Sequence, residues 1–390
     1  MSADDADASA DDVTTETNSD EPVLQLDDVF VHFEQKESLV QQALPDSVGE
    51  RFGMNEPPVQ AVNGISLDIE EEDVIVLVGE SGSGKSTLGR AAVGLEQPTE
   101  GTIRYRGHDI NEVRKGTHGD EDLMWEDVRR ALQIIHQDST AALNPYRSIR
   151  AILAEPLKLW YPELDMNDRY ERLTAMLRTT GITPAEEYLD RYPHQLSGGE
   201  KQRIAIIRAM LVEPDVILAD EVVSALDVSL RIDIMDLLLD LQDMVGTSYV
   251  FISHNLTNAR YFAEKADGRI AVMYMGNIVE MGPAAEVIEN PKHPYTRILK
   301  WASLSLDPDE IDIMEDSPMM TQDAPDPSDP PTGCRFREAC PKAREACAQA
   351  EPTLDSEAGD THVAACYREI PDHEYWDSDW AHGEEHEIPE

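Results

Sequence analysis

A glycine-rich loop between an apolar strand and a helix constrains this chain more than any other feature. Residues 79–86, GESGSGKS, fit the pattern G-x-x-x-x-G-K-[ST], and they follow directly on the apolar run VIVLV at 74–78. Apolar residues at helical spacing come next, at Leu88, Ala91 and Ala92. In this context the glycines let backbone N–H groups turn towards phosphate oxygens, and the helix N-terminus adds partial positive charge. The sequence therefore predicts a phosphate-binding loop.

The side chains of this loop have distinct expected roles. Lys85 would reach the β- and γ-phosphates of ATP, and the Ser86 hydroxyl would be a ligand of Mg²⁺. The other residues would contact the phosphates through their backbone. The predicted nucleotide contacts here are Gly79, Ser81, Gly82, Ser83, Gly84, Lys85, Ser86 and Thr87.

Two acidic residues follow a second apolar strand. Residues 216–219 (VILA) precede Asp220 and Glu221. Asp220 would hold Mg²⁺, directly or through water, and Glu221 would polarise the water that attacks the γ-phosphate. Acids often end strands without any catalytic role, but after a phosphate-binding loop such a pair is the expected partner.

The order of the segments indicates an α/β fold. Strand-like runs at 23–33, 64–69, 74–78, 216–219 and 249–252 alternate with helical patterns, which predicts a parallel sheet. We predict a disordered acidic tail at 1–21 and a main domain at 22–282, with a helical subdomain at about 121–200. A proline- and aspartate-rich linker occupies 307–331. It lies within a C-terminal region at 283–370 that carries all four cysteines, and a second acidic tail at 371–390 follows.

Residues 196–203, LSGGEKQR, resemble the LSGGQ signature of ABC ATPases. The resemblance implies a P-loop NTPase of the ABC type, with a RecA-like core sheet, a helical subdomain and here a small cysteine-rich extension. Ser197, Gly198 and Gly199 would then form a second anion site at a helix N-terminus. Other family positions follow in order. The resemblance makes Gln137 the Q-loop glutamine and Mg²⁺ ligand, Asp227 the D-loop aspartate, His254 the switch histidine and Phe33 the aromatic that stacks on adenine. It thereby implies that Gln137 and His254 are catalytic residues together with Glu221.

The same resemblance implies a dimer. ABC ATPase domains pair head to tail, and each ATP lies between the phosphate-binding loop of one subunit and the LSGGE turn of the other. One copy of each motif is found here, so a second ATPase chain is expected as partner.

Residues 290–299 (NPKHPYTRIL) and 136–145 (HQDSTAALNP) resemble segments of oligopeptide/dipeptide importer ATPases. The insertion at 34–60 is similar to the subunit type whose ATPase partner lacks it. Two membrane permease subunits and an extracytoplasmic solute-binding protein are implied, with the permease docking on residues around 138–180. An importer for nickel or another small solute is the alternative. A soluble, non-transporting ABC ATPase is disfavoured, because the stretch between Gln137 and Ser197 is too short for a long coiled coil.

One position departs from the family pattern D-E-P-[VT]-S-A-L-D. Val222 replaces the proline in Asp220-Glu221-Val222-Val223-Ser224. Proline fixes φ near −65°, whereas valine can reach this φ without enforcing it. We expect activity to survive, so Glu221 keeps its assignment.

The charge and the lack of long apolar runs set the expected environment. Lys and Arg number 32 against 78 Asp and Glu, and removing eight acids from each tail still leaves a net charge of −30. An acidic, lysine-poor surface suggests a halophilic cytosol, since salt screens the self-repulsion. No basic stripe for nucleic acid is seen.

No apolar run is long enough for a transmembrane helix, and the N-terminus lacks the features of a signal peptide. A peripheral protein at the cytoplasmic face of the membrane is expected.

The four cysteines lie in one short stretch, at Cys334, Cys340, Cys347 and Cys366. Disulfides are disfavoured in the cytosol, and unrelated buried cysteines would not cluster in this way. Metal ligation is favoured, and the spacings are looser than those of structural zinc knuckles. The segment 333–341 also resembles the C-x-F-x-x-x-C-P element of peptide-importer ATPases, which implies a 4Fe-4S cluster. Zinc is the rival.

Overall fold

The computed structural model describes residues 21–34, 57–119, 123–304, 326–354 and 360–381. The predictions for residues 1–20, for most of the 34–60 insertion and for most of the 307–331 linker fall outside these ranges.

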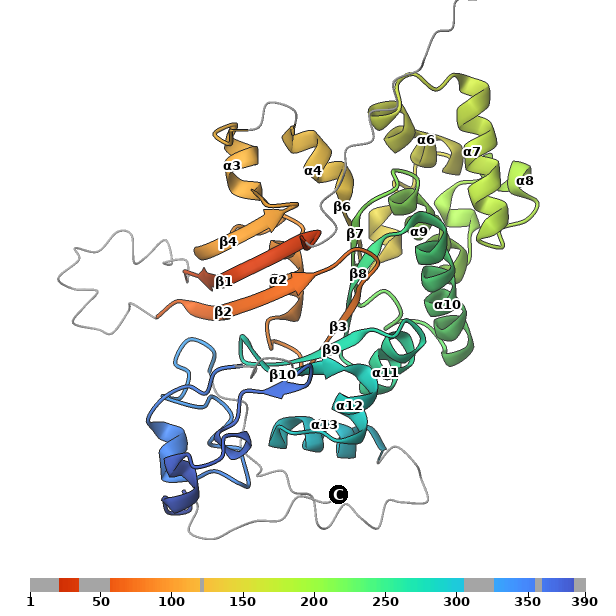
Figure 1. The fold of residues 1–390 in the computed structure, drawn as a ribbon. Coiled ribbons are helices and arrows are strands. Elements are labelled where there is room, and N and C mark those ends of the chain that lie inside the picture. The colour runs from red at the N-terminus through yellow and green to blue at the C-terminus, as the bar shows by residue number, and fades with distance from the viewer. Residues whose placement is uncertain (1–20, 35–56, 120–122, 305–325, 355–359, 382–390) are drawn as a thin grey trace, which may run out of the picture.

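A large, mainly parallel sheet forms the centre of the molecule (Figure 1). Its parallel strands end together at one edge, which is where the sequence places the phosphate-binding loop and the acidic pair. Strand β9 (Arg269–Tyr274) is also parallel to its neighbour, and beyond it β10 (Asn277–Pro283) and β11 (Val363–Ala364) continue the sheet in antiparallel fashion. The strand order is β11 (Val363–Ala364), β10 (Asn277–Pro283), β9 (Arg269–Tyr274), β3 (Val74–Val78), β8 (Ser248–Ser253), β7 (Val216–Asp220) and β6 (Leu132–Ile135).

A smaller antiparallel sheet packs against it, with the helix α2 (Lys85–Ala92) between the two (Figure 1). Leu88, Ala91 and Ala92 of this helix share one apolar core with residues of both sheets, so the helix after the phosphate-binding loop is fixed from two sides. Helix α4 (Trp125–Ala131) contacts β6, and α3 (Ile110–Lys115) contacts α4 and the small sheet. The small sheet has the order β2 (Val59–Ile69), β1 (Leu24–Phe33), β4 (Glu100–Tyr105) and β5 (His108–Asp109).

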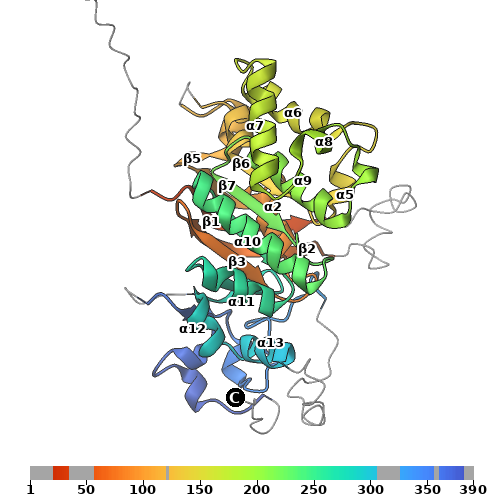
Figure 2. The same ribbon diagram turned by 90° about the vertical axis from the view of Figure 1, so that its right-hand side faces the viewer.

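The other face of the large sheet is covered by helices that share a second apolar core with it. A separate helical subdomain with its own core stands at one end of the molecule (Figure 2). The covering helices are α9 (Gly198–Met210), α10 (Val228–Val245), α11 (Leu256–Lys265), α12 (Ala284–Glu289) and α13 (Pro294–Leu304). The subdomain contains α5 (Ser139–Ala142), α6 (Ile149–Trp160), α7 (Met166–Thr179), α8 (Ala185–Leu189) and the 3-10 turn η2 (Pro193–Gln195).

Two expected boundaries are wrong. The helical subdomain was expected from about residue 121, but β6 at 132–135 belongs to the large sheet and pairs with β7. A run of four residues is too short to show its period, so its pairing with a distant strand decides its conformation.

The second correction concerns the predicted acidic tail at 371–390. Its first part, up to residue 381, folds against residues 334–366, here called the cysteine segment, and Tyr375 is only 2% exposed. The 3-10 turns of this region are η4 (Glu345–Ala348), η5 (Tyr367–Glu369) and η6 (Glu374–Asp377).

Candidate active site

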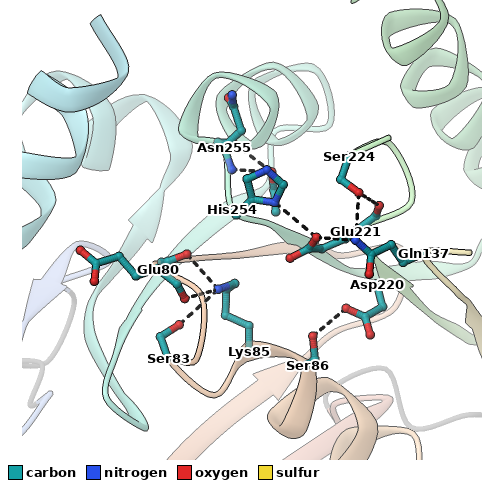
Figure 3. Close-up of polar contacts among 12 residues, drawn as sticks. Glu80, Ser83, Lys85, Ser86, Gln137, Asp220, Glu221, Ser224, His254 and Asn255 are labelled. Atoms are coloured by element: carbon teal, nitrogen blue, oxygen red, sulfur yellow. Dashed lines mark hydrogen bonds and ion pairs between the residues drawn. The ribbon is translucent and has the colours of Figure 1, made fainter. Parts of the chain in front are cut away.

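The phosphate-binding loop turns from the end of β3 into α2. Gly84 caps this helix with φ 103°, a left-handed conformation, and a Cβ there would lie 2.1 Å from the Ala61 carbonyl oxygen. Only glycine fits such a position. The Lys85 ammonium is buried and donates to the carbonyl oxygens of Gly79 (2.8 Å) and Glu80 (2.7 Å). The loop is thus wrapped around the side chain expected to bind phosphate (Figure 3).

Two effects act on the pKa of Lys85 in opposite directions. Burial lowers the pKa of its ammonium, while the nearby carboxylates of Glu221 and Asp220 act in the opposite direction. These carboxylates favour the charged ammonium, which is the form that binds phosphate oxygens.

The end of β7 brings Asp220 next to the start of α2. The Ser86 hydroxyl donates to Asp220 Oδ1 at 2.8 Å, and Arg90 Nη2 lies 3.4 Å from Asp220 Oδ2. A hydroxyl and a buried carboxylate in contact are oxygen ligands of the kind that Mg²⁺ takes. Arg90 was not predicted, although it lies four residues after Ser86 and therefore on the same face of the helix.

Glu221 is the meeting point of three segments that are distant in the sequence. Gln137 Nε2 donates to Glu221 Oε2 at 3.0 Å, and His254 Nδ1 lies 3.3 Å from the same oxygen (Figure 3). The backbone of Glu221 has φ 51°, which is unusual for a residue with a side chain, and its N–H donates to the Ile252 carbonyl. The structure thus brings together all three predicted catalytic residues. Backbone strain such as the positive φ of Glu221 occurs preferentially at functional sites.

Val222, which replaces the family's proline, is 2% exposed and belongs to the core beneath Glu221. The side chain is held by packing, so the turn does not depend on a proline to be defined at this point.

The LSGGE turn forms the N-terminus of α9. The Ser197 hydroxyl accepts from the Glu200 N–H at 3.3 Å, and Glu200 Oε2 accepts from the Ser197 N–H at 2.6 Å, which is a capping box. Ser197 and Gly198 are exposed, whereas Gly199 is buried against Leu230. These hydrogen bonds stay within the turn and do not join it to the phosphate-binding loop of the same chain.

Two further predicted residues lie at element ends. Phe33 ends β1 with 40% of its surface exposed, so it is available for stacking. Asp227 caps α10 by accepting from the Leu230 N–H at 3.1 Å. Ser224, whose hydroxyl lies 3.3 Å from Gln137 Nε2, is a polar neighbour of the site that was not singled out.

The four cysteines form a second candidate site. All four thiols are free and line one cavity, together with basic side chains that include Arg337 and Arg368. Burial raises the pKa of Cys334 to about 12 and that of Cys366 to about 11, so a metal would have to displace their protons. Among the described residues, no group of three or more His, Cys, Asp or Glu side chains is arranged to hold a metal ion.

Comparison with known proteins decides the family. A model described as ABC transporter matches residues 62–224, and a model of the oligopeptide/dipeptide transporter C-terminal region matches residues 279–347. The oligopeptide transport ATP-binding protein OppF of Salmonella typhimurium is 39% identical over 350 residues, covering 90% of this chain and 97% of that protein. This chain belongs to the ATP-binding subunits of oligopeptide/dipeptide ABC transporters.

Other members of this family and two solved cassettes agree with the assignment. The dipeptide transport ATP-binding protein DppF of Haemophilus influenzae is 40% identical, covering 79% of this chain and 89% of that protein. A dimeric ABC cassette in a post-hydrolysis state with ADP and Pi superposes with a TM-score of 0.52 at 25% identity, covering 67% of this chain and 98% of that one. A dimeric bacterial ABC transporter cassette gives 0.53 at 26%, with the same coverage. The ABC ATPase fold and ATPase activity predicted from the motifs are confirmed. In the described ranges, no helix is both long and apolar enough to cross a membrane.

Proposed function

We propose that this chain is the ATP-hydrolysing subunit that powers the import of oligopeptides or dipeptides. The observation that carries the proposal is the convergence of Gln137, Glu221 and His254 beside Lys85 and Asp220, in a chain whose C-terminal region matches peptide transporters. ATP and Mg²⁺ fit this site, because it offers a glycine loop, a cation and a hydroxyl–carboxylate pair.

Each residue has one role in the proposed mechanism. Lys85 leaves its carbonyl partners to bind the β- and γ-phosphates. Ser86 and Asp220 would hold Mg²⁺, with Gln137 as a further ligand, and the bound ion would offset negative charge on the phosphates. Glu221 accepts a hydrogen bond from the attacking water, and His254, within reach of Glu221, interacts with the γ-phosphate.

The assembly follows from the exposed LSGGE turn. Ser197 and Gly198 are free to bind the γ-phosphate of ATP held by a second ATPase subunit, and Asp227 lies near the same seam in the family arrangement. Two permease subunits and an extracytoplasmic binding protein complete the importer, and this chain sits peripherally at the cytoplasmic face of the membrane. The docking groove for the permease lies in the region 138–180.

The test is transport by the complete complex in proteoliposomes. With ATP and the binding protein present, uptake of a labelled di- to pentapeptide is expected, together with peptide-stimulated ATP hydrolysis. Uptake of nickel or another small solute instead of peptides would favour the alternative importer. ATP hydrolysis that no permease or binding protein alters would favour a soluble, non-transporting ATPase.

We also propose that Cys334, Cys340, Cys347 and Cys366 hold a 4Fe-4S cluster that stabilises the C-terminal region. The cavity that all four thiols line supports this, and the neighbouring basic side chains would offset the charge of four thiolates. Zinc is the rival, because four cysteine thiolates are also a ligand set that zinc takes.

Anaerobic purification tests the cluster. About four iron atoms and four labile sulfides per chain are expected, and a Cys334→Ser/Cys340→Ser variant should lose both and melt at a lower temperature. One zinc per chain without iron, or wild-type melting of that variant, would contradict the proposal.

A halophilic setting is the last part of the proposal. Among the described acidic residues only Asp220 and Glu280 are buried, so the excess negative charge lies at the surface. We expect the melting temperature to rise steeply between dilute buffer and about 1 M KCl, where the Debye length falls to about 3 Å. A melting temperature that is independent of salt would remove this idea.

A further inference from the structure

The segment 290–299 resembles a segment of oligopeptide/dipeptide importer ATPases, but none of its residues takes part in the proposed mechanism. In the structure it runs into α13, which lies below the β9–β10 hairpin in Figure 1. Tyr295 of this segment is 1% exposed, and its hydroxyl accepts a hydrogen bond of 3.0 Å from the backbone N–H of Glu80. Glu80 is the second residue of the phosphate-binding loop, and its carbonyl oxygen receives the Lys85 ammonium. Hydrogen bonds therefore hold the peptide units on both sides of Glu80. Tyr295 holds the unit before Glu80, through its N–H, and Lys85 holds the unit after it, through the carbonyl oxygen.

Tyr295 is itself held rigidly. Its N–H donates to His293 Nδ1 at 3.1 Å, and the N–H of His293 donates to the buried carboxylate of Glu280 at 2.8 Å. Burial lowers the pKa of His293 to about 4, so the ring is neutral and Nδ1 can accept at neutral pH. The aromatic ring of Tyr295 packs on Tyr274 at 4.7 Å between centroids.

The cysteine segment also contacts the residues around Tyr295. The ring of Phe336, two residues after Cys334, lies 5.4 Å from that of Tyr295 and 5.1 Å from that of Tyr274. The buried Arg335 donates to the Met275 carbonyl at 2.6 Å and to Gln60 Oε1 at 2.7 Å.

Two of the three partners of Arg335, Met275 and Gln60, are next to residues that contact the loop; the third is Glu351. The N–H of Gly276, next to Met275, donates to the Ser83 carbonyl at 2.9 Å, and Ala61, next to Gln60, backs onto Gly84. The loop is thus held by contacts at Glu80, Ser83 and Gly84. Each of these contacts is connected, through one neighbouring residue or ring, to residues 335–336.

We propose that Tyr295 is a positioning residue for the phosphate-binding loop, supported by Phe336 and Arg335 of the cysteine segment. The proposal rests on nucleotide binding at this loop, as given in the proposed function. A loop that must present several backbone N–H groups to phosphate loses less conformational freedom on binding when it is already ordered. Tyr295 is buried and contacts the loop through the Glu80 N–H, so its effect should fall on nucleotide affinity and leave the chemical step largely unchanged.

The test is the Tyr295→Phe variant of the full chain in its assembled transporter. Phenylalanine keeps the ring packing and removes the acceptor for the Glu80 N–H. We expect the KM and Kd for ATP to rise about two- to tenfold, which is the worth of one ordinary hydrogen bond, with kcat changed less than about twofold. Phe336→Leu, which leaves the hydroxyl but loosens its support, should raise both constants in the same direction.

Tyr249→Phe is the matched control. Tyr249 is also fully buried, and its hydroxyl donates to the Leu238 carbonyl at 2.9 Å, away from the loop. It should lower the melting temperature about as much as Tyr295→Phe while leaving the ATP constants at their wild-type values. Equal constants for Tyr295→Phe and wild type, or equal rises for both tyrosine variants, would overturn the proposal. Failure of the wild-type chain to bind ATP would instead refute the proposed function.

Discussion

The Glu221→Gln variant is expected to lose ATP hydrolysis by at least about 100-fold while it still binds ATP, because general-base assistance is worth about 10² to 10⁴. Glutamine keeps the size of the side chain and its contacts with Gln137 and His254, but it lacks the charge that polarises water. Steady-state phosphate release and equilibrium ATP binding measure the two quantities separately. With ATP bound and hydrolysis blocked, the paired ATPase subunits should accumulate as a closed dimer in size-exclusion chromatography.

Glu213→Gln is a suitable control, because Glu213 also has φ 51° and its exposed side chain pairs with Arg172 at a distance from the site. The two variants make the same chemical change on the same kind of backbone. The control should hydrolyse ATP at the wild-type rate. Near-normal turnover in Glu221→Gln would show that another group activates the water.

A Gly198→Asp variant is expected to lose hydrolysis in the assembled ATPase pair, by at least about 100-fold, with the ATP affinity of the isolated chain unchanged. A Cβ at Gly198 meets no atom within 4 Å, so the fold of the chain should tolerate the change. In the dimer the new carboxylate would face the γ-phosphate held by the partner, and two like charges 4 Å apart repel by about 4 kcal/mol at an effective dielectric of 20. Turnover of the pair and ATP titration of the monomer are the measurements.

A change at Gly198 separates an effect on the partner's nucleotide from an effect on the fold of α9 better than a change at Ser197 or Gly199 does. A Cβ at Gly199 would approach the side chain of Leu230 to 2.7 Å, and Ser197 caps α9, so changes there would also disturb the helix. Gly119→Asp is the matched control, since that glycine is exposed and equally unobstructed but lies elsewhere. If Gly198→Asp weakened ATP binding by the monomer as strongly as Lys85→Ala, the turn would not be acting on a partner's nucleotide.

The sequence by itself determined the nucleotide chemistry and the family. The phosphate-binding loop, the acidic pair and the LSGGE turn are short continuous motifs, and each combines a glycine or charge pattern with the strand or helix beside it. The strands at 74–78, 216–219 and 249–252 were also found, because fully buried parallel strands read as apolar runs. Strands β4, β6 and β10 were not predicted, since short or mixed runs become strands through pairing. Strand β9 was missed although its sequence, RIAVMY, is an apolar run of the same kind.

Only the tertiary structure decided which residues meet. Glu221 contacts Gln137 and His254 because three segments end at one edge of the sheet. The contact between Tyr295 and Glu80 spans 215 residues of sequence, and the ring of Phe336 reaches it from a third segment. Local periodicity carries no information on such pairs. They form because apolar cores and parallel strand ends bring distant parts of the chain to one place, and buried polar groups there must find hydrogen-bond partners.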